Sequence, residues 1–102
     1  ALARNHGTYS RLRKAWLAKP ENRFCHICVP RGLDARPAVE CHHSRGRIGR
    51  LLCEVRFWIP ACTECHDWVH ANPREARRIG VLAPASEFNV FPSTGTALCV
   101  PV

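Results

Sequence analysis

The sequence predicts a small α+β domain that is held together by a metal ion bound to four cysteines. The chain has 102 residues, and a domain of this size has a thin core that disulfides or a structural metal commonly stabilise. Four of its seven cysteines form two C-x-x-C pairs. Between and after these pairs, a strand-like alternation over 38–43 and a helical pattern from residue 63 indicate a mixed fold.

The first third of the chain predicts one short helix. Residues 1–9 show no clear pattern and are expected to fray. Apolar residues at helical spacing predict a helix over 10–19, with Trp16 packed on the core and Pro20 ending the helix. The strand expected over 38–43 then places Val39 and Cys41 on one face and Glu40 and His42 on the other.

The middle of the chain predicts a hairpin followed by a helix. A basic, glycine-containing loop, 44–50, leads to 51–53, which we expect to return as the second strand. Pro60 is expected to prevent a regular continuation through 54–61. A helix capped by Thr63 should then run to about Ala71.

A second helix is predicted after Asn72, which would cap it, with Pro73 in its first position and Gly80 at its end. After Leu82 the composition shifts to proline, serine, threonine and glycine, so an extended tail is expected. This tail is expected to lie over the body through Phe88, Val90 and Phe91. The chain thus divides into a basic arm and helix (1–23), a metal-binding core (24–82) and a Pro-rich tail (83–102).

Charge suggests the class of partner. The formal net charge is +7, with five basic and no acidic residues in 1–19 and no basic residue in 81–102. A positive field of this kind suits a polyanion, most plausibly nucleic acid, although a basic and inert surface is the alternative. No secretory signal is visible, and no apolar run approaches the length of about 18 residues that a membrane span needs. We therefore expect a cytoplasmic protein.

The two C-x-x-C pairs, Cys25/Cys28 and Cys62/Cys65, predict a structural zinc site. Tetrahedral zinc takes four soft ligands, and each pair can supply two. A disulfide framework or a thioredoxin-like redox pair is the alternative, and neither a secretory signal nor a βαβ pattern supports one. The remaining thiols are expected to be ordinary buried or tail cysteines, and His26 a solvent-facing residue; these thiols are Cys41, Cys53 and Cys99.

Four of the six histidines fall in two clusters. His66 and His70 are one helical turn apart, so they can chelate one ion. Neighbours on a strand point in opposite directions, so one of His42 and His43 can join that ion while the other stays free for acid–base work. Such an open three-histidine site is typical of catalytic metals. The alternative is that these histidines merely decorate a helix and a strand.

Taken together, these motifs resemble the small zinc-containing HNH endonucleases that are common in bacteriophage genomes. The resemblance covers residues 24–82 and is carried by both C-x-x-C pairs, by Glu40-Cys-His-His43 followed by Gly46-Arg47 and Gly49, and by Cys65-His66-x-x-x-His70-Ala-Asn72-Pro73 with Ala76-Arg77 after it. It implies a ββα-metal (His-Me finger) fold, in which a hairpin bears the general base and a helix bears metal ligands.

Residue by residue, the resemblance implies that His43 is the general base and that His42, His66 and His70 bind the catalytic metal. Phe57 stands where the family usually has an asparagine that pins the hairpin loop. The implied activity is metal-dependent hydrolysis of DNA phosphodiester bonds with little sequence specificity. Three imidazoles favour Zn²⁺, Ni²⁺, Co²⁺ or Mn²⁺ over Mg²⁺.

The expected partner is double-stranded DNA, with phage packaging proteins as a further possibility. Phosphate contacts are expected from the loop arginines, and a second group on the last helix could extend them; these are Arg45, Arg47 and Arg50, then Arg74, Arg77 and Arg78. The alternative function is a non-catalytic zinc module that binds DNA or a packaging protein through a decayed HNH site. A third reading is a small structural protein that uses zinc only for stability.

Overall fold

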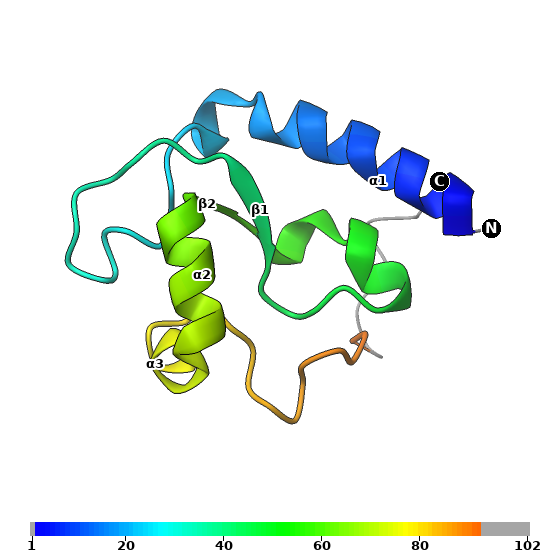
Figure 1. The fold of residues 1–102 in the computed structure, drawn as a ribbon. Coiled ribbons are helices and arrows are strands. Elements are labelled where there is room, and N and C mark those ends of the chain that lie inside the picture. Colours follow the sequence, from blue (N-terminus) through cyan, green and yellow to red (C-terminus); the bar gives the residue numbers. More distant parts are fainter. Residues whose placement is uncertain (1, 93–102) are drawn as a thin grey trace.

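The structure, a computed structural model, describes residues 2–92, with side chains described from residue 7 on. Its two strands form one antiparallel hairpin, which lies between α1 on one side and α2 with α3 on the other (Figure 1). The elements described are α1 (Leu2–Leu17), η1 (Pro20–Asn22), β1 (Glu40–His43), η2 (Gly49–Cys53), η3 (Val55–Phe57), β2 (Trp58–Ala61), α2 (Thr63–Ala71) and α3 (Pro73–Arg78). The prediction of a small α+β domain with an N-terminal helix is confirmed.

Helix α1 begins much earlier than the sequence predicts. It starts at Leu2, so the expectation that residues 1–9 fray is wrong for the part that the structure describes. That stretch contains no proline and several good helix formers, which can extend a helix without any apolar period. The helix packs through Tyr9, Leu12 and Trp16 against Cys41 and Trp58, so Trp16 reaches the core as predicted.

The second strand of the hairpin is β2, and the prediction of a strand over 51–53 is wrong. Residues 49–53 instead form the 3-10 helix η2, which is closed by bonds such as Leu51 N to Ile48 O (3.1 Å). β2 pairs with β1 in a register that sets His42 opposite Ile59 and His43 opposite Trp58. The hairpin loop is therefore longer than expected and contains two 3-10 turns, η2 and η3.

Pro60 lies inside β2, although it was expected to prevent regular structure there. Its carbonyl accepts a hydrogen bond from the His26 amide (2.9 Å) on the side away from β1. The N and C=O of one strand residue point the same way, so the missing N–H of Pro60 also faces away from the ladder. Proline is tolerated at such an edge because no interstrand bond is lost.

Helix α2 has the predicted bounds but a different cap. The N-cap is Cys62, whose Sγ accepts a hydrogen bond from the Cys65 amide (3.4 Å), so Thr63 is the first helical residue and the prediction that it caps the helix is wrong. α3 begins at Pro73 as predicted, but the side chain of Asn72 donates back to the Trp68 carbonyl (3.0 Å) instead of capping α3.

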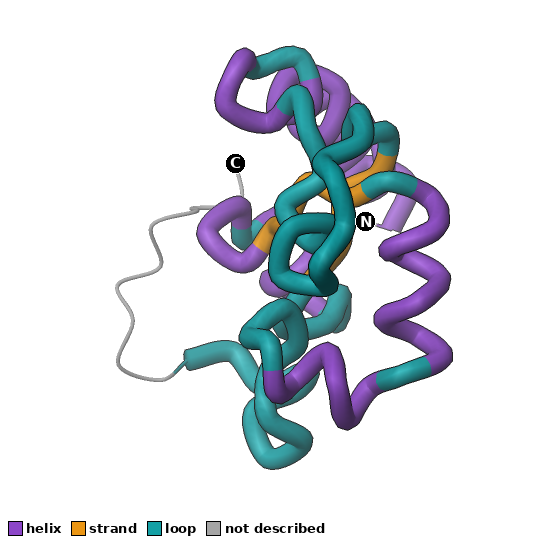
Figure 2. The backbone as a smooth tube through the Cα atoms, turned by 90° about the vertical axis from the view of Figure 1, so that its left-hand side faces the viewer, coloured by secondary structure: helices purple, strands orange, loops and turns teal. Residues whose placement is uncertain are grey.

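Two clusters of buried side chains form the core. One joins α1 to the hairpin through Trp16, Cys41 and Trp58; the other surrounds the four cysteines and includes Ile27, Ala61, Val69, Ala76 and Val81. The two strands lie in the middle of the molecule, with helices around them (Figure 2). No helix among residues 2–92 is long and apolar enough to cross a membrane.

The segment that follows α3 runs along the hairpin loop. The Ala83 amide donates to the Ser44 carbonyl and the Asn89 amide donates to the Arg45 carbonyl (2.8 Å each). We call residues 83–90 the strap. Phe88 and Phe91 are partly buried as expected, whereas Val90 is 49% exposed and that part of the prediction is wrong. Cys99 and the rest of the predicted tail beyond residue 92 lie outside the described residues.

Candidate functional site

The four cysteines of the two C-x-x-C pairs form one buried cluster. All four are at most 6% exposed, and their sulfur atoms all lie within 4.8 Å of one another. Cys28 Sγ is 3.8 Å from Cys62 Sγ and 3.6 Å from Cys65 Sγ. A tetrahedral zinc with Zn–S bonds of about 2.3 Å separates its sulfurs by about 3.8 Å. The cluster is therefore consistent with a structural zinc ion.

Local backbone geometry prepares the sulfurs for this role. Ile27 N–H points at Cys25 Sγ (3.4 Å) in the first knuckle, and the corresponding bond from Cys65 to Cys62 caps α2 in the second. The Arg31 guanidinium donates to Cys65 Sγ (3.3 Å) and stacks over the Trp68 ring at 4.5 Å. Burial raises the pKa of the Cys65 thiol, so a bound cation is what would hold this sulfur as a thiolate.

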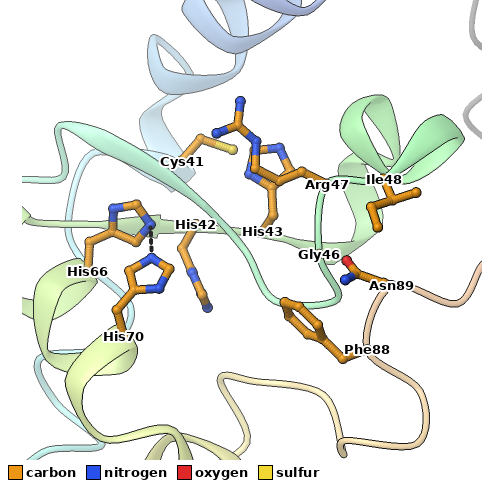
Figure 3. A pocket seen from close by; sticks show the side chains of 10 residues that line it. All are labelled: Cys41, His42, His43, Gly46, Arg47, Ile48, His66, His70, Phe88 and Asn89. Carbon is orange, nitrogen blue, oxygen red and sulfur yellow. Dashed lines mark hydrogen bonds between the residues drawn. The ribbon is translucent and has the colours of Figure 1, made fainter.

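Beside this cluster, on the hairpin side of α2, lies a cavity of about 310 Å³ whose walls carry four histidines. The close-up in Figure 3 shows His42 and His43 projecting from β1 in opposite directions, with His66 and His70 of α2 beside His42. The strap closes one side with Phe88 and Asn89. The complete lining is Cys41, His42, His43, Gly46, Arg47, Ile48, His66, His70, Phe88 and Asn89.

His66 and His70 face one another across one turn of α2. Their Nε2 atoms are 3.4 Å apart. The Nδ1 of His66 contacts the Glu40 carboxylate, which can only accept, so Nδ1 carries the proton and Nε2 presents a lone pair. Two nitrogens bound to one tetrahedral zinc at about 2.0–2.1 Å are about 3.3–3.4 Å apart. The spacing of this pair therefore suits a shared cation, with Glu40 orienting one imidazole as carboxylates do around metal sites.

His42 lies next to this pair but is turned partly away from it. Its ring centroid is 5.4 Å from that of His66 and 6.4 Å from that of His70. Its Nε2 donates to the Val81 carbonyl (2.7 Å), which leaves Nδ1 free to accept or to bind. Burial lowers the pKa of His42 to about 4, so the ring is neutral near pH 7, as a metal ligand must be.

Among residues 2–92, the four cysteines form a set of potential ligands close enough to hold one ion, and the three histidines do not form such a set. The ring of His42 is 5.4 and 6.4 Å from those of His66 and His70, centroid to centroid. The structure thus brings the predicted ligands to one cavity without placing all three at ligand distance.

His43 points to the opposite face of β1 from His42. Its Nε2 donates to the Leu52 carbonyl (3.2 Å), and its ring packs against Tyr9 and Trp58 with centroids 5.4 and 5.5 Å away. Nδ1 is therefore the nitrogen that can accept a proton. Burial, and then the Arg47 guanidinium, lower the pKa of His43 to about 4. The Leu52 carbonyl is thus the group that orients the His43 ring, whereas Glu40 contacts His66.

The three loop arginines predicted to bind phosphate have different surroundings. Arg45 donates to the Val90 carbonyl (2.9 Å) and pairs with the Glu87 carboxylate (3.1 Å), so its guanidinium ties the loop to the strap. Arg47 stacks over Tyr9 at 5.4 Å and Arg50 over Phe91 at 4.2 Å, and both remain exposed.

Phe57, which occupies the place of the expected asparagine, lies beneath two guanidinium groups. Arg45 and Arg56 stand 5.2 and 4.8 Å from its ring centroid. Its carbonyl accepts bonds from the amide and hydroxyl of Ser44 (3.0 and 2.7 Å). The start of the hairpin loop is thus pinned by the backbone of Phe57 and by the Ser44 side chain.

Sequence reasoning missed Asn89 as part of this cavity. Asn89 has φ +66°, a strained conformation that functional sites often contain. It lies against Gly46, and a Cβ added at Gly46 would collide with Asn89 Oδ1. An Asn amid prolines and small residues of an expected tail gave no local signal of this contact, because the contact depends on how the strap folds back.

Comparison of the chain with protein-family models, with curated proteins and with solved structures finds no match.

Proposed function

We propose that this protein is a metal-dependent endonuclease of the HNH type, which hydrolyses DNA phosphodiester bonds with little sequence specificity. The observation that carries the proposal is the pair of Nε2 atoms of His66 and His70, 3.4 Å apart at the wall of a cavity that His42 and His43 also line. An open cavity beside metal-binding imidazoles has room for a phosphate oxygen and a water molecule. The resemblance of the motifs to HNH endonucleases supports the same activity.

The cavity residues have separate roles in this proposal. His66, His70 and His42 would hold a divalent cation, Zn²⁺, Ni²⁺, Co²⁺ or Mn²⁺ in preference to Mg²⁺. Nδ1 is the nitrogen that His42 can offer, because its Nε2 is bonded to the Val81 carbonyl. When bound, such an ion supplies Lewis-acid stabilisation of charge on the phosphate and on the leaving oxygen. Glu40 fixes the tautomer of His66.

His43 is the proposed general base. Its Nε2 proton is committed to the Leu52 carbonyl, so Nδ1 would receive the proton from the attacking water. Its pKa of about 4 keeps the ring unprotonated near pH 7. Arg47, which is exposed beside the base, and Arg50, which is exposed on the same loop, would contact phosphates and read no sequence.

The alternative is a non-catalytic zinc module that binds DNA or a phage packaging protein. Phe57 favours it, because the side chain at this position packs beneath two arginines and offers no amide. Such a module would bind DNA but would need none of the nitrogen atoms that face the cavity.

Cleavage of a supercoiled plasmid tests the proposal. We expect nicking or linearisation with added Mn²⁺, Ni²⁺ or Zn²⁺ and none when EDTA is added, and His43→Ala should lower the rate by about 10²–10⁴-fold, the usual contribution of a general base. Binding to DNA and the bound zinc should persist in this variant. His26→Ala is the matched control, since His26 is exposed and outside the cavity.

No cleavage by the wild-type protein with any of these metals would support the non-catalytic module. Cleavage by His43→Ala at a rate near that of wild type would show that another group is the base.

A further inference from the structure

A second hollow lies directly beside the histidine cavity. It measures about 530 Å³, runs between α1 and β1, and is lined by Tyr9, Arg13, Val39, Glu40, Cys41, Arg47 and His66. Cys41, Arg47 and His66 line both hollows. The groove therefore continues from the proposed metal-binding histidines towards α1, a helix to which the proposed function gives no role.

Two guanidinium groups face this groove, and neither forms an ion pair with a described carboxylate. Among the described residues, the Arg13 side chain makes no hydrogen bond or ion pair, and the Arg47 guanidinium stacks over the Tyr9 ring. Glu40 is the carboxylate in the lining; it pairs with His66 and is also within electrostatic reach of Arg13.

Both arginines act on the same part of the groove. Burial raises the pKa of Tyr9, and the positive charges of Arg13 and Arg47 oppose this rise. The two guanidinium groups are therefore within electrostatic reach of the same side chain. Two positive charges at one hollow, against the single carboxylate of Glu40 in its lining, form an environment suited to an anion.

We propose that Arg13 and Arg47 form a phosphate subsite that holds the DNA backbone next to the bond placed at the histidines, and that α1 is thus part of the nucleic-acid interface. The inference rests on the proposed function for the identity of its ligand, a phosphodiester. Arginine suits this role because its planar fork can bind two phosphate oxygens at once. The shared lining residues make the subsite continuous with the histidine cavity, so a single strand can occupy both.

The test compares Arg13→Ala with Arg11→Ala. Arg11 lies on the same helix, carries the same charge and is exposed, but it does not line the groove. Binding of a fluorescently labelled DNA duplex is measured by anisotropy at salt concentrations from about 50 to about 200 mM, without added divalent metal. We expect Arg13→Ala to weaken binding several-fold and to lower the salt slope by about one, as loss of one phosphate contact does. Arg11→Ala should change both quantities much less.

A measurement on the wild-type protein covers the case in which Arg13→Ala does not fold. Addition of the same duplex should shift the side-chain Nε–Hε resonances of Arg13 and Arg47 more than that of Arg11. Equal effects of the two substitutions, or equal shifts of the three resonances, would overturn the subsite.

The plasmid assay run in parallel separates this inference from the proposed function. If the wild-type protein binds DNA without cleaving it and Arg13 is still selectively required, the subsite stands and the nuclease proposal fails. If the wild-type protein cleaves while Arg13 and Arg11 behave alike, the nuclease proposal stands and the subsite fails.

Discussion

Two groups of potential metal ligands share helix α2. Cys62 and Cys65 belong to its N-terminal end, and His66 and His70 occupy the following turn. The thiol cluster is closed to solvent, since its four cysteines are buried and their sulfur atoms lie within 4.8 Å of one another. The histidine group borders a cavity of about 310 Å³, and His70 is exposed. The difference matches that between structural metal sites, which use all positions for protein ligands, and catalytic sites, which leave one open.

The same comparison suggests that the placement of the two α2 histidines depends on the thiol cluster. The cap of α2 is a cysteine of the thiol cluster, so a metal bound there would fix the start of the helix that carries both histidines. The orientation of His42 and His43, by contrast, depends on carbonyls of Val81 and Leu52, which come from loops. The thiol cluster is thus expected to stabilise the fold, while the neighbouring histidines carry the proposed chemistry and are oriented by other parts of the chain.

The largest expected effect is on the thiol cluster. Cys62→Ser should abolish cooperative unfolding and zinc binding at near-neutral pH, because structural zinc contributes apparent binding energies of about 10–16 kcal/mol to small domains. Circular dichroism melting and metal analysis measure this. Cys41→Ser is the matched control: Cys41 is also buried, but it lies outside the cluster. An unchanged melting temperature for Cys62→Ser would show that the thiol cluster does not stabilise the fold. The proposed difference between the thiol cluster and the histidines would then not hold.

An effect of intermediate size on stability is expected from the protonation of His43, which lines the histidine cavity. His43 has a pKa of about 4 when folded and about 6.5 when free, so between these values the unfolded chain binds more protons and stability falls as pH drops from 6.5 towards 4. The free-energy advantage of wild type over His43→Gln should shrink across this range by at most about 3 kcal/mol. Urea unfolding at several pH values measures it.

Because wild type and His43→Gln have the same thiol cluster, effects of acid on that cluster cancel when their free energies of unfolding are subtracted. An advantage that stays constant from pH 6.5 to pH 4.5 would show that His43 is not held as a buried neutral ring.

The smallest expected effect concerns the strap. Gly46 and Gly32 both have positive φ (+98° and +84°), but an added Cβ meets Asn89 only at Gly46. Alanine at either position carries a backbone strain of about 1–3 kcal/mol, and Gly46→Ala should cost about 1 kcal/mol more because the Asn89 side chain must move. Thermal unfolding of the two variants measures the difference.

Asn89→Ala should remove this excess in combination with Gly46→Ala, as a double-mutant cycle reports for residues in contact. Equal losses for Gly46→Ala and Gly32→Ala would mean that the strap does not press on the hairpin loop.

The features that the sequence predicted correctly are set by local spacing. The bounds of α2 follow from its helical period, and the thiol cluster follows from two C-x-x-C pairs. The hairpin was predicted with the wrong second strand because 51–53 and 58–61 are both apolar, and only pairing with β1 decides between them.

The candidate site was predictable in part for the same reason. Spacing alone placed His66 and His70 on one face of a helix, and strand alternation separated His42 from His43. The partners that set the tautomers, such as the Val81 and Leu52 carbonyls, come from irregular segments that carry no periodic signal. Arg13 lies inside the helix predicted over 10–19, but only the packing of α1 against β1 places it at the groove.

One consequence follows from the parity of β1. Successive strand residues face opposite sides, so Glu40 and His42 meet α2 while Cys41 and His43 meet α1 and η2. Inserting a single residue ahead of β1 would exchange these two sides and bring Cys41 and His43 to face α2, whereas inserting two would restore the original order. The two adjacent histidines are therefore not interchangeable. The surroundings of each depend on whether it occupies an even or an odd position along a strand of only four residues.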